Sequence, residues 1–211
     1  MLLAREGAAG WTYRRLSKAA GASRGAVGYV MEDLRRLGFL EEAEGKRQLR
    51  RKPQLRERWA RRFAERLRPK LSRGRFWFAG ESAPGQWRQL KLDSGETRWG
   101  GEPAAGLLVG DLRPKQLTLY SRKKTSEVCQ GLGMAPDEEG PIEMLDMFWD
   151  PGALEGRVLE EDRALEDQEA PALGPPESVP PLLVYADLVA GADPRGVEAA
   201  RRLREKYFPV E

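Results

Sequence analysis

Histidine is absent from this chain of 211 residues, and cysteine occurs once, at Cys129. The lack of histidine excludes catalysis by an imidazole acid or base and the usual zinc sites. A single cysteine cannot form an intrachain disulfide, which agrees with a reducing compartment. The sequence has no apolar run near the roughly 18 residues of a membrane helix and no apolar signal-peptide core. We therefore expect a cytoplasmic protein that needs no metal, cofactor or membrane.

Positive charge is concentrated in the first third of the chain. The 36 Lys and Arg exceed the 33 Asp and Glu by only three, but residues 1–75 hold 21 of the basic and 8 of the acidic residues. The net charge is therefore +13 in residues 1–75 and −10 in the rest. A basic amino-terminal part beside an acidic remainder is typical of a nucleic-acid-binding protein with a separate second domain.

Residues 11–40 have the pattern of two short helices joined by a tight turn. Gly21 follows the first predicted helix and is the residue best able to adopt the left-handed conformation at a helix C-terminus. Ser23 is a favoured N-cap for the second helix. The residues expected to face inward are Tyr13, Leu16, Ala19 and Ala20 in the first helix, and Val27, Val30, Met31, Leu34 and Leu37 in the second.

This pattern is typical of a DNA-reading helix-turn-helix, in which the second helix meets base edges and the first crosses the phosphates. The residues expected in the groove are Ser23, Arg24, Gly25, Gly28 and Tyr29, and those expected on the DNA backbone are Thr12, Arg14, Arg15 and Lys18. Residues 39–50 predict two short strands around Gly45, a wing that presents Lys46 and Arg47. We therefore predict a winged helix-turn-helix domain over residues 1–52. The alternative is a helical hairpin that only packs against the rest of the protein.

Residues 53–74 predict a basic amphipathic helix that connects this domain to the next. Its expected buried face consists of Leu55, Trp59, Ala60, Phe63, Ala64, Leu67 and Leu71. Its expected outward face consists of Arg56, Arg58, Arg61, Arg62, Arg66 and Arg68. These arginines could follow DNA phosphates next to the recognition helix. The alternative, which we favour, is a solvated face with i, i+4 ion pairs.

Residues 75–211 predict a small mixed α/β domain, so the whole chain belongs to the α+β class. Strands are expected at 75–79, 116–120 and 142–149, and a buried helix in the stretch GGEPAAGLLVG. Two helices are expected at the end, one stopped by Gly191 and one capped by Asp193 that runs from Pro194 to about Tyr207. The last helix is expected to bury Val197, Ala200, Leu203 and Tyr207. Residues 155–177 are acidic and aperiodic, which predicts an exposed loop.

Five blocks of the chain resemble, in order, those of the AbiEi-type antitoxins of type IV toxin-antitoxin systems. The blocks are WTYRRLSKAAGASRGAVGYVMEDLRRLGFL, RWARRFAERLRPKL, WGGEPAAGLLVGDLRPKQLTLY, MLDMFW and PPLLVYADLVAGADPRGVEAARRLREKY. The resemblance implies a winged-helix domain that represses its own operon by binding promoter repeats. It also implies a second domain that counteracts a nucleotidyltransferase-class toxin without lasting contact.

Carried over to this sequence, the resemblance places the DNA role on Arg24, Gly25 and Tyr29. It places the antitoxin role on the domain that holds Gly101, Glu102, Asp187 and Arg195. We expect a monomer or a weak dimer that binds double-stranded DNA.

Two other function classes stay open. A magnesium-dependent nuclease would hold its ion with carboxylates, and the candidates are Glu102, Asp111, Glu143, Asp146 and Asp187, with Lys115 or Lys123 near the attacking water. The sequence shows no Asp…Glu-x-Lys cluster on adjacent strands, and carboxylates at helix starts are more often caps. A protein-interaction module, with an acidic domain that binds a basic partner, is the third alternative. Our hypothesis is a sequence-specific DNA-binding repressor with an antitoxin domain.

Overall fold

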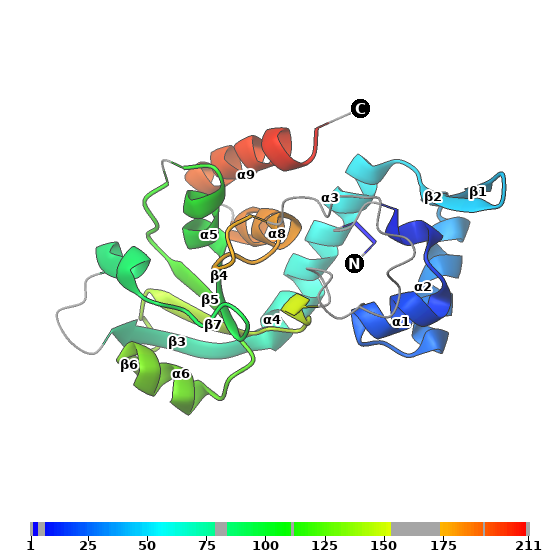
Figure 1. Ribbon diagram of the computed structural model, residues 1–211. Coiled ribbons are helices and arrows are strands. Elements are labelled where there is room, and N and C mark those ends of the chain that lie inside the picture. Colours follow the sequence, from blue (N-terminus) through cyan, green and yellow to red (C-terminus); the bar gives the residue numbers. More distant parts are fainter. Residues whose placement is uncertain are drawn as a thin grey trace. The chain divides into compact units, whose positions relative to one another are not determined.

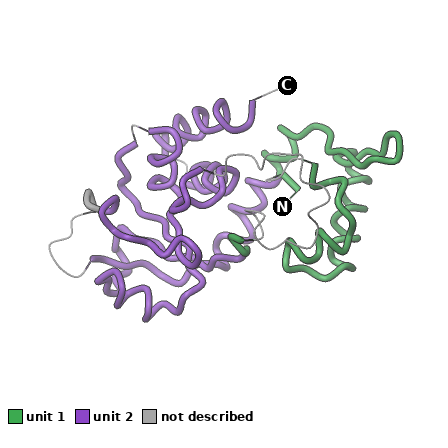
Figure 2. The backbone as a smooth tube through the Cα atoms, in the orientation of Figure 1, with its two compact units in different colours: residues 1–58, 149–172 green, residues 59–148, 173–211 purple. Residues whose placement is uncertain are grey.

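The computed structural model of the chain describes residues 2–3, 7–78, 84–110, 112–152, 174–191 and 193–209. The chain divides into two compact units, residues 1–58 with 149–172 and residues 59–148 with 173–211 (Figure 2). The first unit contains helices and a hairpin, and the second contains a five-stranded mixed sheet with helices, two of which end the chain (Figure 1). This arrangement confirms the predicted α+β class. None of the helices within the described ranges is long and apolar enough to cross a membrane.

The first unit has a small apolar core. A 3-10 turn, Ala8–Gly10, precedes α1 (Tyr13–Ala20), α2 (Arg24–Arg36) and the antiparallel hairpin of β1 (Leu40–Ala43) and β2 (Lys46–Leu49). The buried side chains of this core are Ala9, Leu16, Val27, Met31 and Leu40, with Trp11, Tyr13, Leu34 and Leu49 packed against them.

The predicted burial of two residues in this pair of helices was wrong. Val30 is one of the exposed large hydrophobic residues, and Ala20 is exposed as well. Val27 and Met31 are one helical turn apart and share the centre of the α2 stripe, whereas Val30 lies about 60° or more to one side of that centre. The few elements of this small unit cover only the middle of the stripe.

The basic connecting helix is interrupted. It consists of α3 (Lys52–Arg62), a π-helical turn (Phe63–Leu67) and α4 (Arg68–Leu71). A π turn contains one more residue than an α turn, so it rotates the residues that follow by about 100° relative to an unbroken α-helix. Leu67 is therefore exposed and Arg68 is largely buried. The sequence predicted the opposite for both residues.

The sheet of the second unit has the strand order β4-β5-β7-β3-β6. Its strands are β3 (Ser72–Phe78), β4 (Thr97–Gly100), β5 (Leu117–Ser121), β6 (Met134–Pro136) and β7 (Ile142–Asp146). β5 and β7 are parallel, and the other neighbouring pairs are antiparallel. Every residue of β5 is buried, as expected for a strand covered on both faces. The three strands predicted in this region are confirmed.

Three helices lie together on one side of this sheet: α5 (Gly101–Leu108), α8 (Pro181–Gly191) and α9 (Pro194–Tyr207) (Figure 1). The remaining helical segments are a 3-10 turn, Pro84–Gln89, and α6 (Thr125–Leu132). Asp193 caps α9 as predicted, since its Oδ1 accepts from the Arg195 backbone N–H at 2.8 Å. The predictions for α5, α8 and α9 are confirmed.

The buried face of α9 differs from the prediction in two residues, since Val197 is exposed and Tyr207 is only half-buried. Ala200 and Leu203 are buried, but Val197 is 58% exposed. The helix instead buries Gly196 and Ala199. A Cβ on Gly196 would lie 3.4 Å from the Leu188 carbonyl oxygen, so α8 and α9 approach each other through small residues.

The predicted acidic loop at 155–177 lies outside the described residues except for its last four positions.

Candidate nucleic-acid interface

Local hydrogen bonds define the two helices of the first unit. The Thr12 hydroxyl accepts from the Arg15 backbone N–H at 3.2 Å, and the Ser23 hydroxyl accepts from the Ala26 N–H at 3.1 Å. Gly21 has φ 60° and ends α1, a conformation that residues with a side chain rarely adopt. The predicted glycine turn and Ser23 cap are thus confirmed. Thr12 and Ser23, both expected to contact DNA, act as helix caps in the free protein.

The outer face of α2 carries a large exposed aromatic side chain. Tyr29 is 84% exposed, and Arg24 and Gly25, one turn before it, are exposed too. No hydrogen bond or ion pair holds the side chain of Arg24 or Tyr29 within the described part of the chain. Gly28 is half-buried, and a Cβ there would lie 3.8 Å from the Tyr13 ring. Arg24, Gly25 and Tyr29 therefore form the open part of the predicted recognition surface.

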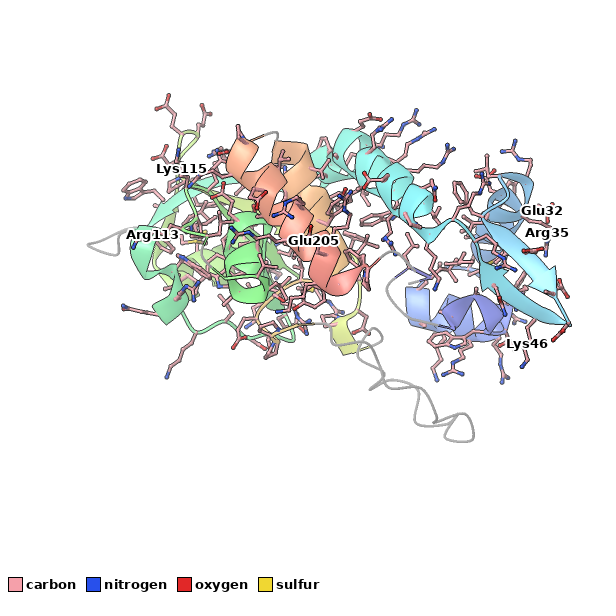
Figure 3. The ribbon with its side chains drawn as sticks, turned by 90° about the horizontal axis from the view of Figure 1, so that it is seen from above. Glu32, Arg35, Lys46, Arg113, Lys115 and Glu205 are labelled. Carbon is pink, nitrogen blue, oxygen red and sulfur yellow. The ribbon has the colours of Figure 1, made fainter. Side chains whose placement is uncertain are left out.

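The acidic residues of α2 are paired with arginines on the same helix. Glu32 binds Arg35 at 2.6 Å (both labelled in Figure 3). Asp33 binds Arg36, also at 2.6 Å, and both pairs have i, i+3 spacing. These pairs lie beyond the amino-terminal half of the helix. They reduce the repulsion that the two carboxylates would exert on a phosphate.

The two basic residues predicted at the hairpin tip, Lys46 and Arg47, differ in how exposed they are. Glu44 and Gly45 both have positive φ, 53° and 73°, the conformation of a tight two-residue hairpin turn. Lys46 is exposed beside this turn (Figure 3). Arg47 instead donates from Nη2 to the Trp11 carbonyl oxygen at 2.7 Å, and its guanidinium lies 5.0 Å from the Tyr13 ring. Arg47 therefore fixes the hairpin to the segment before α1.

The two arginines of α1 that were predicted to contact the DNA backbone differ from each other in exposure. Arg14 is exposed. The Arg15 guanidinium carbon lies 4.0 Å from the centre of the Trp11 ring, a cation–π arrangement, and its Nε is buried with no acceptor among the described residues. Arg15 is thus held in one orientation against Trp11.

In the second unit, Gly101 and Asp187 meet in a buried network. The Asp187 side chain is only 1% exposed and accepts hydrogen bonds from the Gly101 N–H at 3.1 Å, the Tyr120 hydroxyl at 2.9 Å and Arg68 Nε at 3.1 Å. Arg68 Nη2 also binds Glu143 at 2.6 Å. The network joins α4, α5, α8 and two strands of the sheet.

Burial and charge shift the ionisation of this network. Burial raises the pKa of the Asp187 carboxyl above its ordinary value, and Arg68 partly offsets this effect. Burial and the neighbouring Asp187 carboxylate raise the pKa of Tyr120 well above its usual range. Burial opposes the charge of Arg68, but Asp187 and Glu143 outweigh it and hold the Arg68 pKa above its ordinary value.

Sequence reasoning named Asp187 but missed Arg68 and Tyr120 as its partners. One signal was present, because Asp187 is the only charged residue of the apolar stretch LLVYADLVAG, and a buried carboxylate requires buried donors. The identity of the donors depended on the π turn and the sheet register, which no local pattern shows.

The other two candidates of the second domain form a separate pair. Glu102 Oε2 accepts from the Lys115 backbone N–H at 2.6 Å. Its Oε1 lies 3.8 Å from Arg195 Nη2, and the other terminal nitrogen of Arg195 lies 3.4 Å from the Arg113 carbonyl oxygen. The four candidates are therefore two pairs, Gly101 with Asp187 and Glu102 with Arg195.

A protein-family model described as a transcriptional regulator, the AbiEi antitoxin of a type IV toxin-antitoxin system, matches residues 48–209. The chain belongs to the AbiEi antitoxin family. The matched range begins in β2 and includes Gly101, Glu102, Asp187 and Arg195. No curated protein and no solved structure matches the chain. The family assignment confirms the resemblance seen in the last four sequence blocks, whereas the first block, residues 11–40, lies before the matched range.

A nuclease would need carboxylates that are free to hold a metal ion. In this AbiEi-family protein, the described candidates are bound to hydrogen-bond donors of the protein itself. Asp187 and Glu143 bind Arg68, Glu102 binds a backbone N–H, and Asp146 accepts from Arg73 Nε at 2.6 Å. Asp111 lies outside the described residues. Across the described ranges, no group of three or more His, Cys, Asp or Glu side chains is arranged to hold a metal ion. The described candidate carboxylates are therefore engaged in hydrogen bonds and ion pairs within the protein.

Proposed function

We propose that this AbiEi-family regulator is a sequence-specific DNA-binding repressor of its own operon and the antitoxin of a type IV pair. The observation that carries the DNA-binding role is the exposed face of α2, where Arg24, Gly25 and Tyr29 are open to solvent. Val27 and Met31 on the opposite side form the core, so the exposed face is held by a rigid element.

The chemistry of this face suits the major groove. Arg24 is the first residue of α2, and an arginine there can donate two hydrogen bonds to the acceptors of a guanine. Gly25 has no side chain to keep the helix from the bases, and Tyr29 adds an apolar surface one turn later. Arg14, Arg15 and Lys46 would then bind phosphates on either side of the groove.

We assign residues 1–52 to the DNA-binding domain, 53–74 to the connecting segment, whose helical part ends at Leu71, and 75–211 to the effector domain. The expected DNA partner is a set of promoter repeats. The effector domain, with its Gly101–Asp187 and Glu102–Arg195 pairs, would counteract a nucleotidyltransferase-class toxin without lasting contact. Support for this part comes from the family assignment.

A salt-titrated gel shift tests the DNA-binding role. The full chain, Arg24→Ala and Arg204→Ala are compared on the upstream DNA of the gene and on random DNA of equal length. Arg24→Ala should weaken binding to the upstream DNA by about 5- to 150-fold, since a bidentate base contact is worth about 1–3 kcal/mol, with a much smaller effect on random DNA. Arg204 lies in the last turn of α9 and is exposed, so its replacement removes the same charge outside α2.

Lys46→Ala should weaken binding to both DNAs evenly and lower the salt slope by about 1, because a phosphate contact carries no sequence information. If Arg24→Ala left both affinities unchanged, the recognition-helix assignment would be wrong.

Co-expression tests the antitoxin role separately. The full chain should relieve the growth arrest caused by the product of the adjacent gene, and Arg24→Ala should relieve it equally when both are expressed from the same external promoter. Growth arrest that persists with the full chain would contradict the antitoxin role and leave the DNA-binding role intact.

A further inference from the structure

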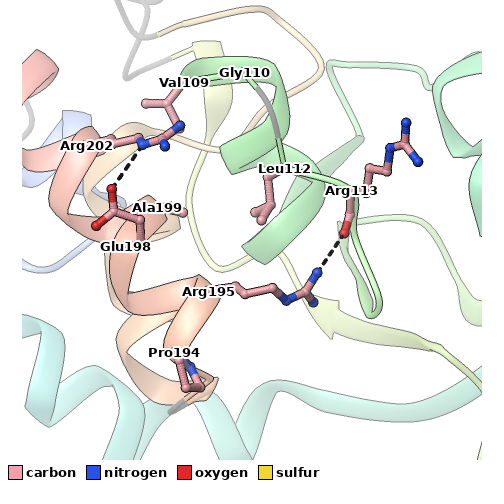
Figure 4. Close-up of a pocket in the computed structure, with 9 residues that line it drawn as sticks. All are labelled: Val109, Gly110, Leu112, Arg113, Pro194, Arg195, Glu198, Ala199 and Arg202. Carbon is pink, nitrogen blue, oxygen red and sulfur yellow. Dashed lines mark hydrogen bonds and ion pairs between the residues drawn. The ribbon is translucent and has the colours of Figure 1, made fainter.

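The second unit contains a pocket of about 540 Å³ beside Arg195 (Figure 4). It lies between the end of α5 with the segment that follows it and the first turns of α9. The lining includes Leu112, Arg113, Arg195, Glu198, Ala199 and Arg202.

Among the described residues, its charged lining is mainly cationic, with three arginines against one glutamate. Glu198 is already engaged, because it accepts from Arg202 Nε at 3.2 Å and from Arg201 Nη2 at 2.7 Å. The Glu198–Arg202 pair and the contact of Arg195 with the Arg113 carbonyl lie at separate ends of the pocket, with Leu112 and Ala199 drawn between them (Figure 4).

Arg195 lacks a partner for one of its donors. Its Nη2 atom is buried and has no hydrogen-bond acceptor among the described residues. The carboxylates of Asp193 and Glu102 are its ion-pair neighbours at 3.7 and 3.8 Å, which is too far for a hydrogen bond. Glu102 is held by the Lys115 backbone N–H, and Asp193 by the cap of α9. Because this atom is buried, a bound oxygen could reach it only after the guanidinium group turns. The Arg195 side chain as a whole is 39% exposed, and neither neighbouring carboxylate holds it at hydrogen-bonding distance.

We propose that this pocket binds a small molecule that carries more than one phosphate, with phosphate oxygens on Arg195 at one end, phosphate oxygens on Arg202 at the other, and the part between them against Leu112 and Ala199. The planar guanidinium group matches phosphate in geometry and charge and can bind two of its oxygens at once. The volume lies within the range of small-molecule sites, about 300–1,000 Å³, and the mixture of apolar walls with a few polar groups is typical of them. This site does not depend on DNA binding by α2, which belongs to the other unit.

Isothermal titration calorimetry on the full chain tests the proposal with inorganic phosphate, tripolyphosphate and ATP as probes. The titrations are run at about 0.15 M salt, where attraction between distant exposed charges is screened. We expect saturable binding of at least one probe with one site per chain. Stronger binding of ATP than of tripolyphosphate identifies a nucleotide site, and equal binding identifies a polyphosphate site.

Three variants locate the site. Arg195→Gln and Arg202→Gln should each weaken binding about tenfold or more, because each loses charge-assisted hydrogen bonds to phosphate. Arg204→Gln should change the affinity less than twofold, since it removes the same charge from an exposed position of α9 that does not line the pocket. The side chain of Arg202 is about half exposed, so its variant tests the site even if Arg195→Gln fails to fold.

Absence of saturable binding by the unaltered chain would overturn the proposal. So would an equal loss of affinity in Arg204→Gln and Arg202→Gln, which would indicate general attraction to the charged surface, or a stoichiometry of several probe molecules per chain.

Discussion

Replacing Asp187 with asparagine tests how strongly the buried network stabilises the second unit. Asparagine is close to aspartate in size, so Asp187→Asn removes the charge without opening a cavity. Arg68, whose side chain is only 21% exposed, would keep Glu143 as its single carboxylate partner. The amide group of the asparagine would also turn a donor toward Arg68, Tyr120 or the Gly101 N–H, each of which now donates to Asp187.

The expected cost follows from burial and the remaining partner. Removing one member of a buried ion pair costs about 3–5 kcal/mol when the other charge is left alone. Glu143 still compensates Arg68, and burial raises the pKa of Asp187, so the native carboxylate carries a desolvation cost that asparagine avoids. We therefore expect Asp187→Asn to lower the free energy of unfolding by about 2–3 kcal/mol.

Urea unfolding followed by circular dichroism at pH 7 measures this loss, with Asp146→Asn as the control. Asp146 is 52% exposed and pairs with Arg73, so its variant should lose less than about 1 kcal/mol. A loss below about 1 kcal/mol in Asp187→Asn, or an equal loss in both variants, would refute the view that the network is an energetically important part of the core.

Three further predictions concern pH, backbone conformation and capping. Folding raises the pKa of Tyr120, so its contribution to the free energy of unfolding is complete below about pH 10 and is lost as the pH rises further. The loss arises because the tyrosine then ionises in the unfolded chain but not in the folded one. In urea unfolding at increasing alkaline pH, Tyr120→Phe should therefore lose less stability than the unaltered chain. Gly101→Ala should lower the free energy of unfolding by about 1–3 kcal/mol, because φ is +48° and a Cβ would lie 2.7 Å from Thr118 Oγ1. Thermal melts measure this loss, with Gly131→Ala, a helical site with open space, as a control that should be neutral or stabilising. Equal losses in both variants would contradict the strain argument. Ser23→Ala should destabilise the first unit by about 1 kcal/mol in urea unfolding through loss of the α2 cap, and an unchanged midpoint would show that the hydroxyl bond contributes little.

The predictions that the structure confirms rest on short-range interactions. Gly21, Ser23 and Asp193 act on backbone groups within about three residues, so their roles are visible in the sequence. The exposed positions of Val30 and Val197 were not visible, because an amphipathic helix has a wide apolar stripe and its neighbours decide how much of that stripe is covered.

The sequence by itself determined the two capped helices of residues 11–40, the α+β class, the charge difference between the two parts of the chain and the AbiEi family blocks. Each depends on composition, local spacing or block order. Only the tertiary structure decided that Arg68 turns inward to meet Asp187, 119 residues away, and that Arg195 lines a pocket with Arg202 and the segment at Arg113. Contacts between such distant residues depend on a single π turn, the sheet register and the approach of α9 to α5, and these arise when the whole core packs.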